Sequence, residues 1–137
     1  MPENASEGLS PIVPYLYYED AGAAIDFMEK AFGFEIESAV RNGDDGQVIH
    51  AQVRAGNSVL FVGPGMEAFG TRAVPDSERV SAMIYVFVHD VDAHYLRAKG
   101  AGARIREELH EHFGGNRQYT ASDLGGHRWS FAQPIAE

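Results

Sequence analysis

The chain has 137 residues, 45% of them hydrophobic, so it is long enough to bury a core of its own. Eleven basic against twenty acidic residues give a formal charge of -9, which disfavours nucleic acid and anionic membranes as partners because both bind basic surfaces. Cysteine is absent, which excludes disulfides, thiolate metal sites and cysteine nucleophiles.

The first half of the chain predicts a strand, a helix and three further strands. Residues 1–10 contain no apolar secretion segment, so we expect a flexible leader and a cytoplasmic protein. A strand is predicted over 12–18 and a helix over 21–32, with Asp20 as its N-cap and Gly33 just after its end. The next strands are expected at 34–41, 47–54 and 58–62, the last two joined by a glycine turn.

A polar connection over 63–80 follows, which is long enough to be either a linker or a functional loop. The first pattern then returns. A strand is predicted at 81–88 and a helix at about 91–99, capped by Asp90 or Asp92. The remaining segments are a strand at 103–108, a loop at 110–116, and a hairpin of 117–122 and 128–131 around a turn at 123–126.

The two halves are related by an internal repeat. Residues 15–20 align with 85–90 at an offset of 70, and Gly56 aligns with Gly125 at an offset of 69. The second offset sets His50 over Tyr119. Two small units of this kind must share a core, because neither alone buries enough apolar area. We therefore predict one domain over 11–137 with module 1 at about 11–63, a connecting loop at 64–80 and module 2 at about 81–134.

Paired βαβββ modules resemble the vicinal oxygen chelate superfamily, which includes glyoxalase I, extradiol dioxygenases, fosfomycin-modifying enzymes and bleomycin resistance proteins. Three stretches (46–58, 113–117 and 123–130) look like its PhnB-like glyoxalase-family branch. That branch usually has Asp-Pro-Phe-Gly-His where this chain has Asp123-Leu-Gly-Gly-His127. The resemblance implies an α+β fold: an open, cup-shaped mixed sheet with helices on its outer face. It also implies a homodimer in which the partner completes each cup.

The resemblance further implies positions for metal ligands inside the cup. These positions are Val13, Phe61, Met83 and Ser130, whose side chains are poor ligands for a divalent metal. We therefore expect the usual metal site to be absent and predict no cofactor. A divalent metal held by other residues stays open, with His50, the pair His110 and His112, or His127 as candidates.

Strand alternation within this fold predicts which side chains enter the cup. The expected ligand-binding residues are Tyr15, Tyr17, His50, Tyr85, Phe87, Arg117 and Tyr119. Such a surface suits a flat, partly apolar ligand whose carboxylate Arg117 could hold, with cation–π capture as the rival use. The tyrosines could instead be dimer contacts. Trp129 is expected in the core beside Leu60, Val62 and Phe131.

Three functions remain open at this point. The first is a binding protein that takes up a small aromatic molecule in its cup without the usual metal. The second is a glyoxalase-like lyase or isomerase, metal-dependent or not, with His50 as the base. The alternative role for His50 is that of a hydrogen-bonded histidine within its strand. The third and least supported is an extradiol dioxygenase, which needs two histidines and an acid around iron.

Overall fold

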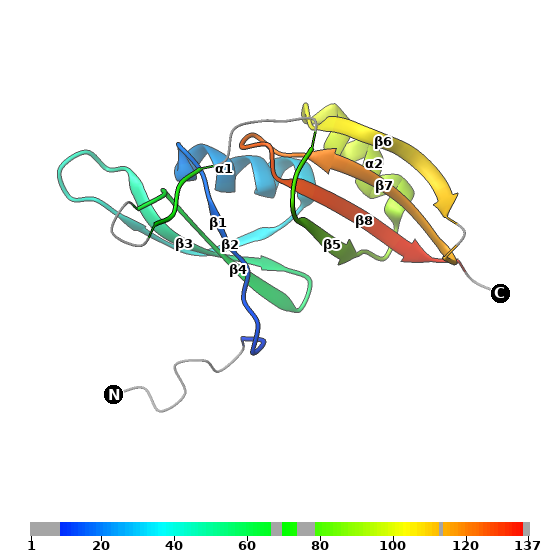
Figure 1. Cartoon of the computed structure of the whole chain (residues 1–137), viewed down its shortest axis with the longest axis horizontal. Helices are drawn as coiled ribbons and strands as arrows, with labels where there is room; N and C mark the ends of the chain where they lie inside the picture. Colours follow the sequence, from blue (N-terminus) through cyan, green and yellow to red (C-terminus); the bar gives the residue numbers. More distant parts are fainter. Residues whose placement is uncertain (1–8, 67–69, 74–78, 113, 136–137) are drawn as a thin grey trace.

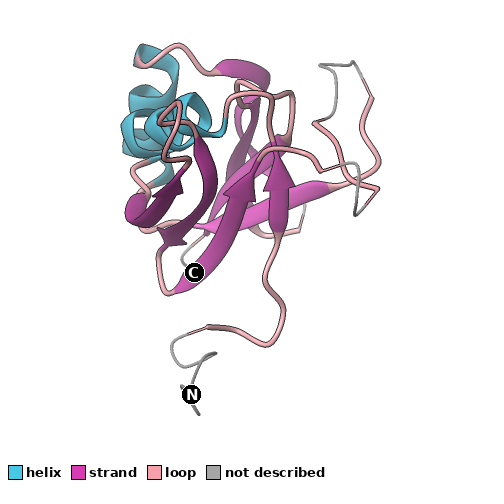
Figure 2. Cartoon of the chain, turned by 90° about the vertical axis from the view of Figure 1, so that its left-hand side faces the viewer, coloured by secondary structure: helices cyan, strands magenta, loops and turns pink. Residues whose placement is uncertain are grey.

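Two four-stranded mixed sheets form the framework of the chain, and the helices lie together beside them (Figures 1 and 2). The computed structural model describes residues 9–66, 70–73, 79–112 and 114–135. The strand order is β1-β4-β3-β2 in sheet A and β5-β8-β7-β6 in sheet B. In each sheet the first strand runs parallel to the fourth and the other pairs are antiparallel. The predicted pair of βαβββ modules is confirmed.

Module 1 begins with a short strand and a helix whose two ends follow the sequence signals. Asp20 caps the helix, since its Oδ1 accepts a hydrogen bond from the Ala23 N–H at 3.0 Å. Gly33 ends it in the left-handed conformation, with φ of 73°. The elements are β1 (Tyr15–Tyr17), α1 (Ala21–Phe27), the π-helical turn η1 (Met28–Phe32), β2 (Glu35–Arg41), β3 (Val48–Ala55) and β4 (Ser58–Gly63).

Module 2 repeats this order with one longer strand. Asp90 is the N-cap of its helix, which settles the choice between Asp90 and Asp92. The predicted loop at 110–116 is wrong at its start, because β6 continues to His112 and stays paired with β7. No helix in the described ranges is long and apolar enough to cross a membrane. The elements are β5 (Met83–Phe87), α2 (Val91–Gly100), β6 (Arg104–His112), β7 (Asn116–Ser122) and β8 (Arg128–Pro134).

Aromatic side chains from both modules meet between the helices and the sheets. The ring of Phe32, at the end of η1, lies 5.5 Å from Trp129 and 4.8 Å from Phe131, measured between centroids. Phe34 also lies 5.5 Å from Trp129. Both β8 rings are 0% exposed, which confirms the core position predicted for Trp129. These ring contacts join module 1 to module 2, and aromatic pairs at such centroid distances stabilise the packing of the two modules.

The end of η1 leaves backbone carbonyls without helical partners, and α2 supplies donors to them. The Arg97 guanidinium donates to the Glu29 and Lys30 carbonyls, both at 2.9 Å. His94 lies 2.8 Å from the Phe32 carbonyl through Nε2. Burial lowers the pKa of His94, with a further contribution from the Arg97 charge, so we assign it as the neutral tautomer that donates from Nε2.

A buried carboxylate joins the β7–β8 turn of module 2 to the first strand of module 1. Asp123 Oδ2 accepts hydrogen bonds from the Tyr18 hydroxyl and, at 2.9 Å, from Trp129 Nε1. Its Oδ1 accepts from the N–H groups of Gly125 and His127, both at 3.0 Å. Four donors therefore surround one carboxylate, which offsets the cost of burying it.

Candidate functional site

The open face of each sheet, meaning the face turned away from the helices, carries many of the residues expected in the cup. On sheet A, Tyr15 stacks on Tyr17 with ring centroids 4.8 Å apart and an interplanar angle of 13°. Phe61 lies edge-on to Tyr15 at 5.7 Å and to His50 at 5.0 Å. We call Tyr15, Tyr17, His50 and Phe61 the aromatic cluster. Three of them were predicted, and Phe61 had been considered only as a metal-ligand position.

A hydrogen bond orients His50 within the aromatic cluster. The Tyr15 hydroxyl lies 3.0 Å from His50 Nδ1. Burial, with help from neighbouring Tyr17, raises the pKa of Tyr15, so its hydroxyl keeps its proton. We assign this hydroxyl as the donor and Nδ1 as the acceptor, which puts the imidazole proton on Nε2. Within the described residues Nε2 has no hydrogen-bond partner, so it can donate to a ligand.

A polar group borders the aromatic cluster on sheet A. Glu37 accepts from Gln52 Nε2 at 2.9 Å and from Arg54 Nε. The hydrogen bond from Arg54 is the main reason that the pKa of Glu37 is lowered, and the Gln52 bond adds to it. The Arg54 charge is thus compensated by an adjacent carboxylate rather than presented to an anionic ligand.

Sheet B carries a matching arrangement built from neutral side chains. The Tyr85 hydroxyl donates to Gln118 Oε1 and accepts from Asn116 Nδ2 at 3.1 Å. Phe87 lies 5.5 Å from the Tyr85 ring and is 62% exposed. This face therefore offers aromatic surface with amide groups beside it, and no charged group takes part in these bonds.

Arg117 and Tyr119 do not lie on the open face, so the predicted orientation of these two residues is wrong. Both point toward the helix side. Arg117 Nε donates to Asp92 Oδ1 at 2.9 Å. Tyr119 is 0% exposed, and its hydroxyl lies 2.6 Å from Nδ1 of His94. Burial raises the pKa of Tyr119. A ligand on the open face would reach neither side chain.

The physical reason is the length of the last turn in each module. Phe61 of β4 is equivalent to Ser130 of β8, because each pairs with the first-strand tyrosine of its module, Tyr15 or Tyr85. On the other side, Phe61 pairs with Gln52 of β3, and Ser130 pairs with Thr120 of β7. Nine positions separate Gln52 from Phe61, whereas ten separate Thr120 from Ser130. The module 2 turn is therefore longer by one residue. A slip of one residue moves every side chain of a strand to the opposite face.

With this register, His50 corresponds to Gln118 rather than to Tyr119. The two hydrogen bonds of Tyr15 to His50 and Tyr85 to Gln118 are then equivalent features of the two modules. Sequence reasoning missed Gln118 because it aligned the turn glycines instead of the paired strands. Ile49 shows a similar effect: strand alternation places it on the helix side with Ala51 and Val53, but it is 44% exposed, since the pairing of β2 with β3 shifts register there.

The residues at the four expected metal-ligand positions do not fit a divalent metal. Ser130 Oγ donates to Met83 Sδ at 3.2 Å and also bonds Thr120, so two of the positions do meet as the resemblance implies. Phe61 supplies only its ring to the aromatic cluster. In the part of the chain that the structure describes, no three His, Cys, Asp or Glu side chains gather in a geometry that could hold a metal.

The histidines considered as alternative ligands have other contacts. His110 and His112 lie on β6 with ring centroids 6.0 Å apart, and the His110 Nδ1 lies 2.9 Å from the Glu108 carbonyl. His127 Nε2 lies 3.0 Å from the Tyr17 carbonyl, and its ring packs on Tyr18 at 4.7 Å. His127 therefore joins the turn of module 2 to β1.

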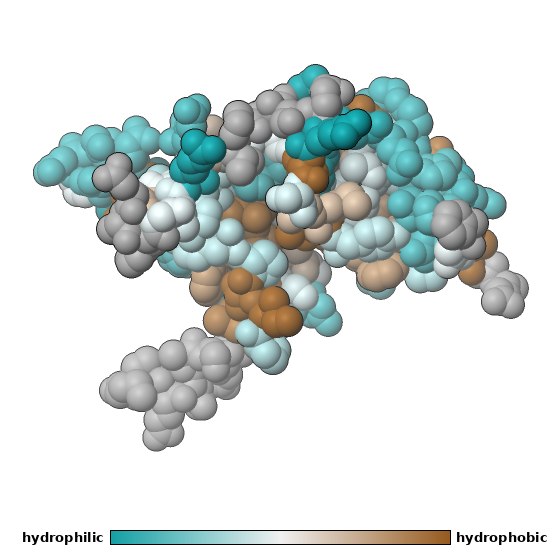
Figure 3. Space-filling model, viewed as in Figure 1, coloured by the Kyte–Doolittle hydropathy of each residue, from teal (hydrophilic) through white to brown (hydrophobic). Residues whose placement is uncertain are grey.

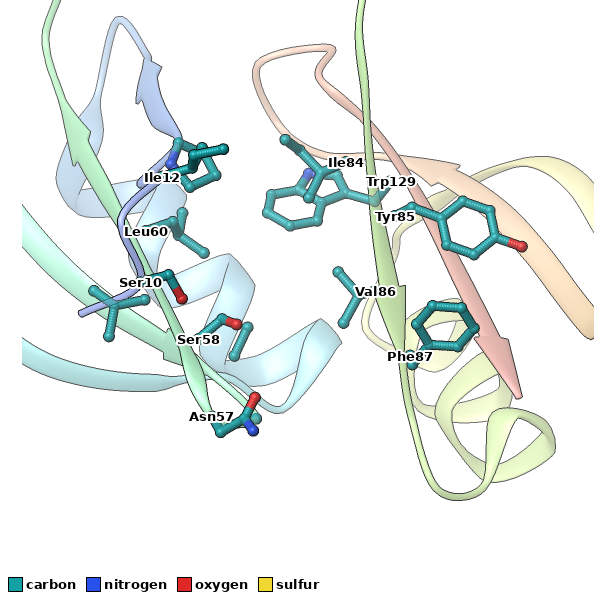
Figure 4. Close-up of a pocket in the computed structure, with 14 residues that line it drawn as sticks. Ser10, Ile12, Asn57, Ser58, Leu60, Ile84, Tyr85, Val86, Phe87 and Trp129 are labelled. Carbon is teal, nitrogen blue, oxygen red and sulfur yellow. The ribbon is translucent and has the colours of Figure 1, made fainter. Parts of the chain in front are cut away.

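A cleft of about 360 Å³ lies between the modules, bordered by β4 and residues 10–14 on one side and by β5 on the other (Figure 4). The side chains of Ile84 and Val86 point into it, whereas those of Tyr85 and Phe87 project from the opposite side of β5. Apolar surface gathers near the middle of the molecule, between more hydrophilic ends (Figure 3). Sequence reasoning did not identify this cleft, because it arises from how the two modules are placed.

Comparison with known proteins gives consistent matches along the chain. The sequence profile described as "Glyoxalase/Bleomycin resistance protein/Dioxygenase superfamily" matches residues 8–131. An uncharacterized protein of Mycobacterium bovis is 35% identical over 127 residues, covering 90% of this chain and 83% of that protein.

Solved structures show the same fold. TioX from Micromonospora sp. ML1 superposes with a TM-score of 0.67 at 30% identity, covering 93% of this chain and 98% of that chain. A PhnB protein from Bacillus cereus, titled a putative 3-demethylubiquinone-9 3-methyltransferase, superposes at 0.64 with 17% identity, covering 90% and 99%. A glyoxalase/bleomycin resistance protein/dioxygenase from Nocardioides gives 0.67 with 16% identity, covering 92% and 85%. The last two likenesses concern the fold alone.

Proposed function

Because the chain belongs to the glyoxalase/bleomycin resistance protein/dioxygenase superfamily, we propose that it binds a small aromatic molecule on its open sheet faces without the usual metal site. The observation that carries this proposal is the aromatic cluster. Stacked Tyr15 and Tyr17, with Phe61 edge-on, give a flat apolar surface, and His50 offers one N–H beside it. Aromatic walls with a few oriented polar groups are typical of small-molecule sites.

The ligand that fits this surface needs no carboxylate. Arg117, predicted to hold one, is bonded to Asp92 on the helix side, and Arg54 is bonded to Glu37. The formal charge of -9 also disfavours the approach of anions. A hydrogen-bond acceptor placed to meet His50 Nε2–H is the polar feature that the site would select.

We also propose that two chains associate so that each open face is completed by the partner. The exposed rings of Phe87 and Tyr85 support this, because both lie on β5 and a partner chain that covered them would remove apolar surface from water. Light scattering coupled to size-exclusion chromatography tests it. A chain that remains monomeric at micromolar concentration would contradict the proposal.

Closer membership in the PhnB-like branch is a further proposal, supported by the three sequence stretches over 46–58, 113–117 and 123–130. It concerns ancestry and adds no ligand.

A lyase or isomerase with His50 as base is the second candidate function, and the Tyr15–His50 hydrogen bond favours it over other enzymatic alternatives. That reaction needs the tautomer opposite to the one assigned above: the Tyr15 hydroxyl would accept from Nδ1–H, which leaves Nε2 as the basic atom. His50→Gln would then abolish turnover and retain binding. A binding protein would show no turnover with either side chain.

A thermal-shift screen of uncharged and charged aromatic compounds tests the main proposal. We expect ligands that raise the melting temperature of the wild type and have no effect on Tyr17→Ala. Leu96→Ala is the matched control, because Leu96 is exposed on α2, away from the open faces. Elemental analysis should show less than one metal per chain, and chelator treatment should leave binding unchanged. Binding that requires a stoichiometric metal would refute the proposal.

A further inference from the structure

The cleft between the modules is a second candidate site, separate from the aromatic cluster. On β5, Ile84 and Val86 lie on the same face of sheet B as their partners Trp129 and Phe131, which is the helix side. However, α2 packs against β6, β7 and β8 and leaves the outer strand β5 largely uncovered. Ile84 and Val86 therefore pack against the core on one side only, and both remain half-buried at the border of the cleft.

Opposite apolar walls border this space. Leu60 of β4 and Ile12 face Ile84, Val86 and the indole of Trp129 across the cleft (Figure 4). The Trp129 Nε1 is engaged by Asp123, so only the apolar ring is directed to the cleft. Ile12 is 83% exposed, which is unfavourable for an apolar side chain. A molecule bound in the cleft would shield this side chain from water.

Charge is missing from the cleft lining. The polar side chains that border it on the module 1 side are Ser10, Asn57 and Ser58, which gather toward one end, and none of the lining residues is titratable apart from Tyr85. Tyr85 directs its ring to the other side of β5. A charged ligand would lose its hydration here without gaining a partner of opposite charge.

We propose that this cleft binds an uncharged, largely apolar ring compound, with one hydrogen-bonding group near Asn57 and Ser58. Its volume of about 360 Å³ lies within the range of small-molecule sites, which often form between structural units. The cleft shares no residue with the aromatic cluster, so the proposal does not depend on that cluster, although Tyr85 and Phe87 of the sheet B open face also border the cleft.

A pair of related fluorescent probes tests the charge preference. N-phenyl-1-naphthylamine is uncharged, and 8-anilino-1-naphthalenesulfonate carries a sulfonate on the same ring system. Trp129 is the single tryptophan of the chain, so energy transfer from it reports that a probe is bound, and the substitutions described next locate it. We expect one site per chain for the uncharged probe, with about tenfold weaker binding of the sulfonate. Equal binding of the two probes, or no saturable binding of the uncharged one, would overturn the proposal.

Substitutions inside and outside the cleft locate the probe. Val86→Phe fills the cleft and should weaken the uncharged probe about tenfold, whereas Leu96→Ala, at an exposed position of α2 that does not line the cleft, should leave its affinity unchanged. Tyr17→Ala should also leave it unchanged, which separates this site from the aromatic cluster. If Val86→Phe does not fold, Ile12→Ser replaces it, since Ile12 is exposed. An unchanged affinity in the cleft variant would refute the assignment.

A second copy of the chain is the rival occupant. Sedimentation equilibrium of the wild type, Val86→Phe and Ile12→Ser should give the same association state, with and without the uncharged probe. If the cleft substitutions dissociate a dimer, or if the probe competes with dimer formation, the cleft is an interface between copies and the ligand proposal is wrong.

Discussion

The two modules use the same hydrogen bond with different chemistry. In module 1 the first-strand tyrosine, Tyr15, bonds His50, whereas in module 2 its equivalent, Tyr85, bonds Gln118. A glutamine oxygen can only accept, so the direction of the second bond is fixed. Module 1 therefore offers an imidazole at this place, and module 2 offers a neutral amide of similar reach. Any acid–base chemistry on the open faces would belong to module 1.

The modules also differ in the turn before the last strand. Module 1 turns tightly around Gly56, while the longer turn of module 2 encloses Asp123 and docks on Tyr18 of module 1. The extra residue thus creates both a contact between the modules and a different side-chain register. One insertion explains why the repeat is regular in its topology and irregular in the residues that it presents.

The largest expected effect comes from Asp123→Asn. In this variant the asparagine NH₂ would face hydrogen-bond donors in place of a carboxylate oxygen. The donors that lose their acceptor are either Tyr18 and Trp129 or two backbone N–H groups. We expect a loss of about 3 kcal/mol in the free energy of unfolding, measured by urea denaturation. Asp90→Asn is the matched control, because asparagine caps a helix nearly as well as aspartate, and it should cost about 0.5 kcal/mol or less. Equal losses would contradict this role for Asp123.

The next effect separates the two turn glycines. A Cβ on Gly125 would lie 2.5 Å from Tyr18 Cδ2, so Gly125→Ala should cost about 2 kcal/mol through overpacking. Gly56 has open space around it but a φ of 63°, so Gly56→Ala should cost about 1 kcal/mol through backbone strain. Asparagine tolerates that conformation, so Gly56→Asn should be milder than Gly56→Ala, whereas Gly125→Asn should be no milder than Gly125→Ala. Thermal denaturation of the four variants checks this pattern.

The sequence predicted topology better than the positions of side chains in space. Alternation and helix signals, such as Asp20 and Gly33, act over a few residues, so they could be recognised directly. The face on which Tyr119 lies depends on a turn longer by one residue, which glycine alignment cannot detect. The cleft beside Val86 depends on how far α2 reaches across sheet B. Such features follow from packing between distant segments and have no local signal.

A smaller effect concerns His94, whose equivalent in module 1 at the repeat offset of 70 is Ala24. The pKa of His94 is lowered in the folded chain, so the unfolded chain binds the proton more readily. Its stabilising contribution is complete above the unfolded value of about 6.5 and declines as the pH falls through the lower folded value. His94→Gln keeps hydrogen-bonding groups without titrating. The stability difference between wild type and this variant should therefore narrow or reverse between pH 7 and 5, as followed by urea unfolding. A difference constant over this range would contradict it.

The smallest expected effect compares Tyr15→Phe with Tyr85→Phe. Each removes one partly exposed hydroxyl, so each should change the free energy of unfolding by about 1 kcal/mol or less. Only Tyr15→Phe deprives His50 Nδ1 of its donor, and the population of the Nε2–H tautomer should then fall. Nitrogen-15 chemical shifts of the imidazole measure that population, with Tyr85→Phe as the control that leaves them unchanged. If the shifts of His50 are the same in both variants, the hydroxyl of Tyr15 does not orient this histidine, and the proposed N–H toward the ligand loses its basis.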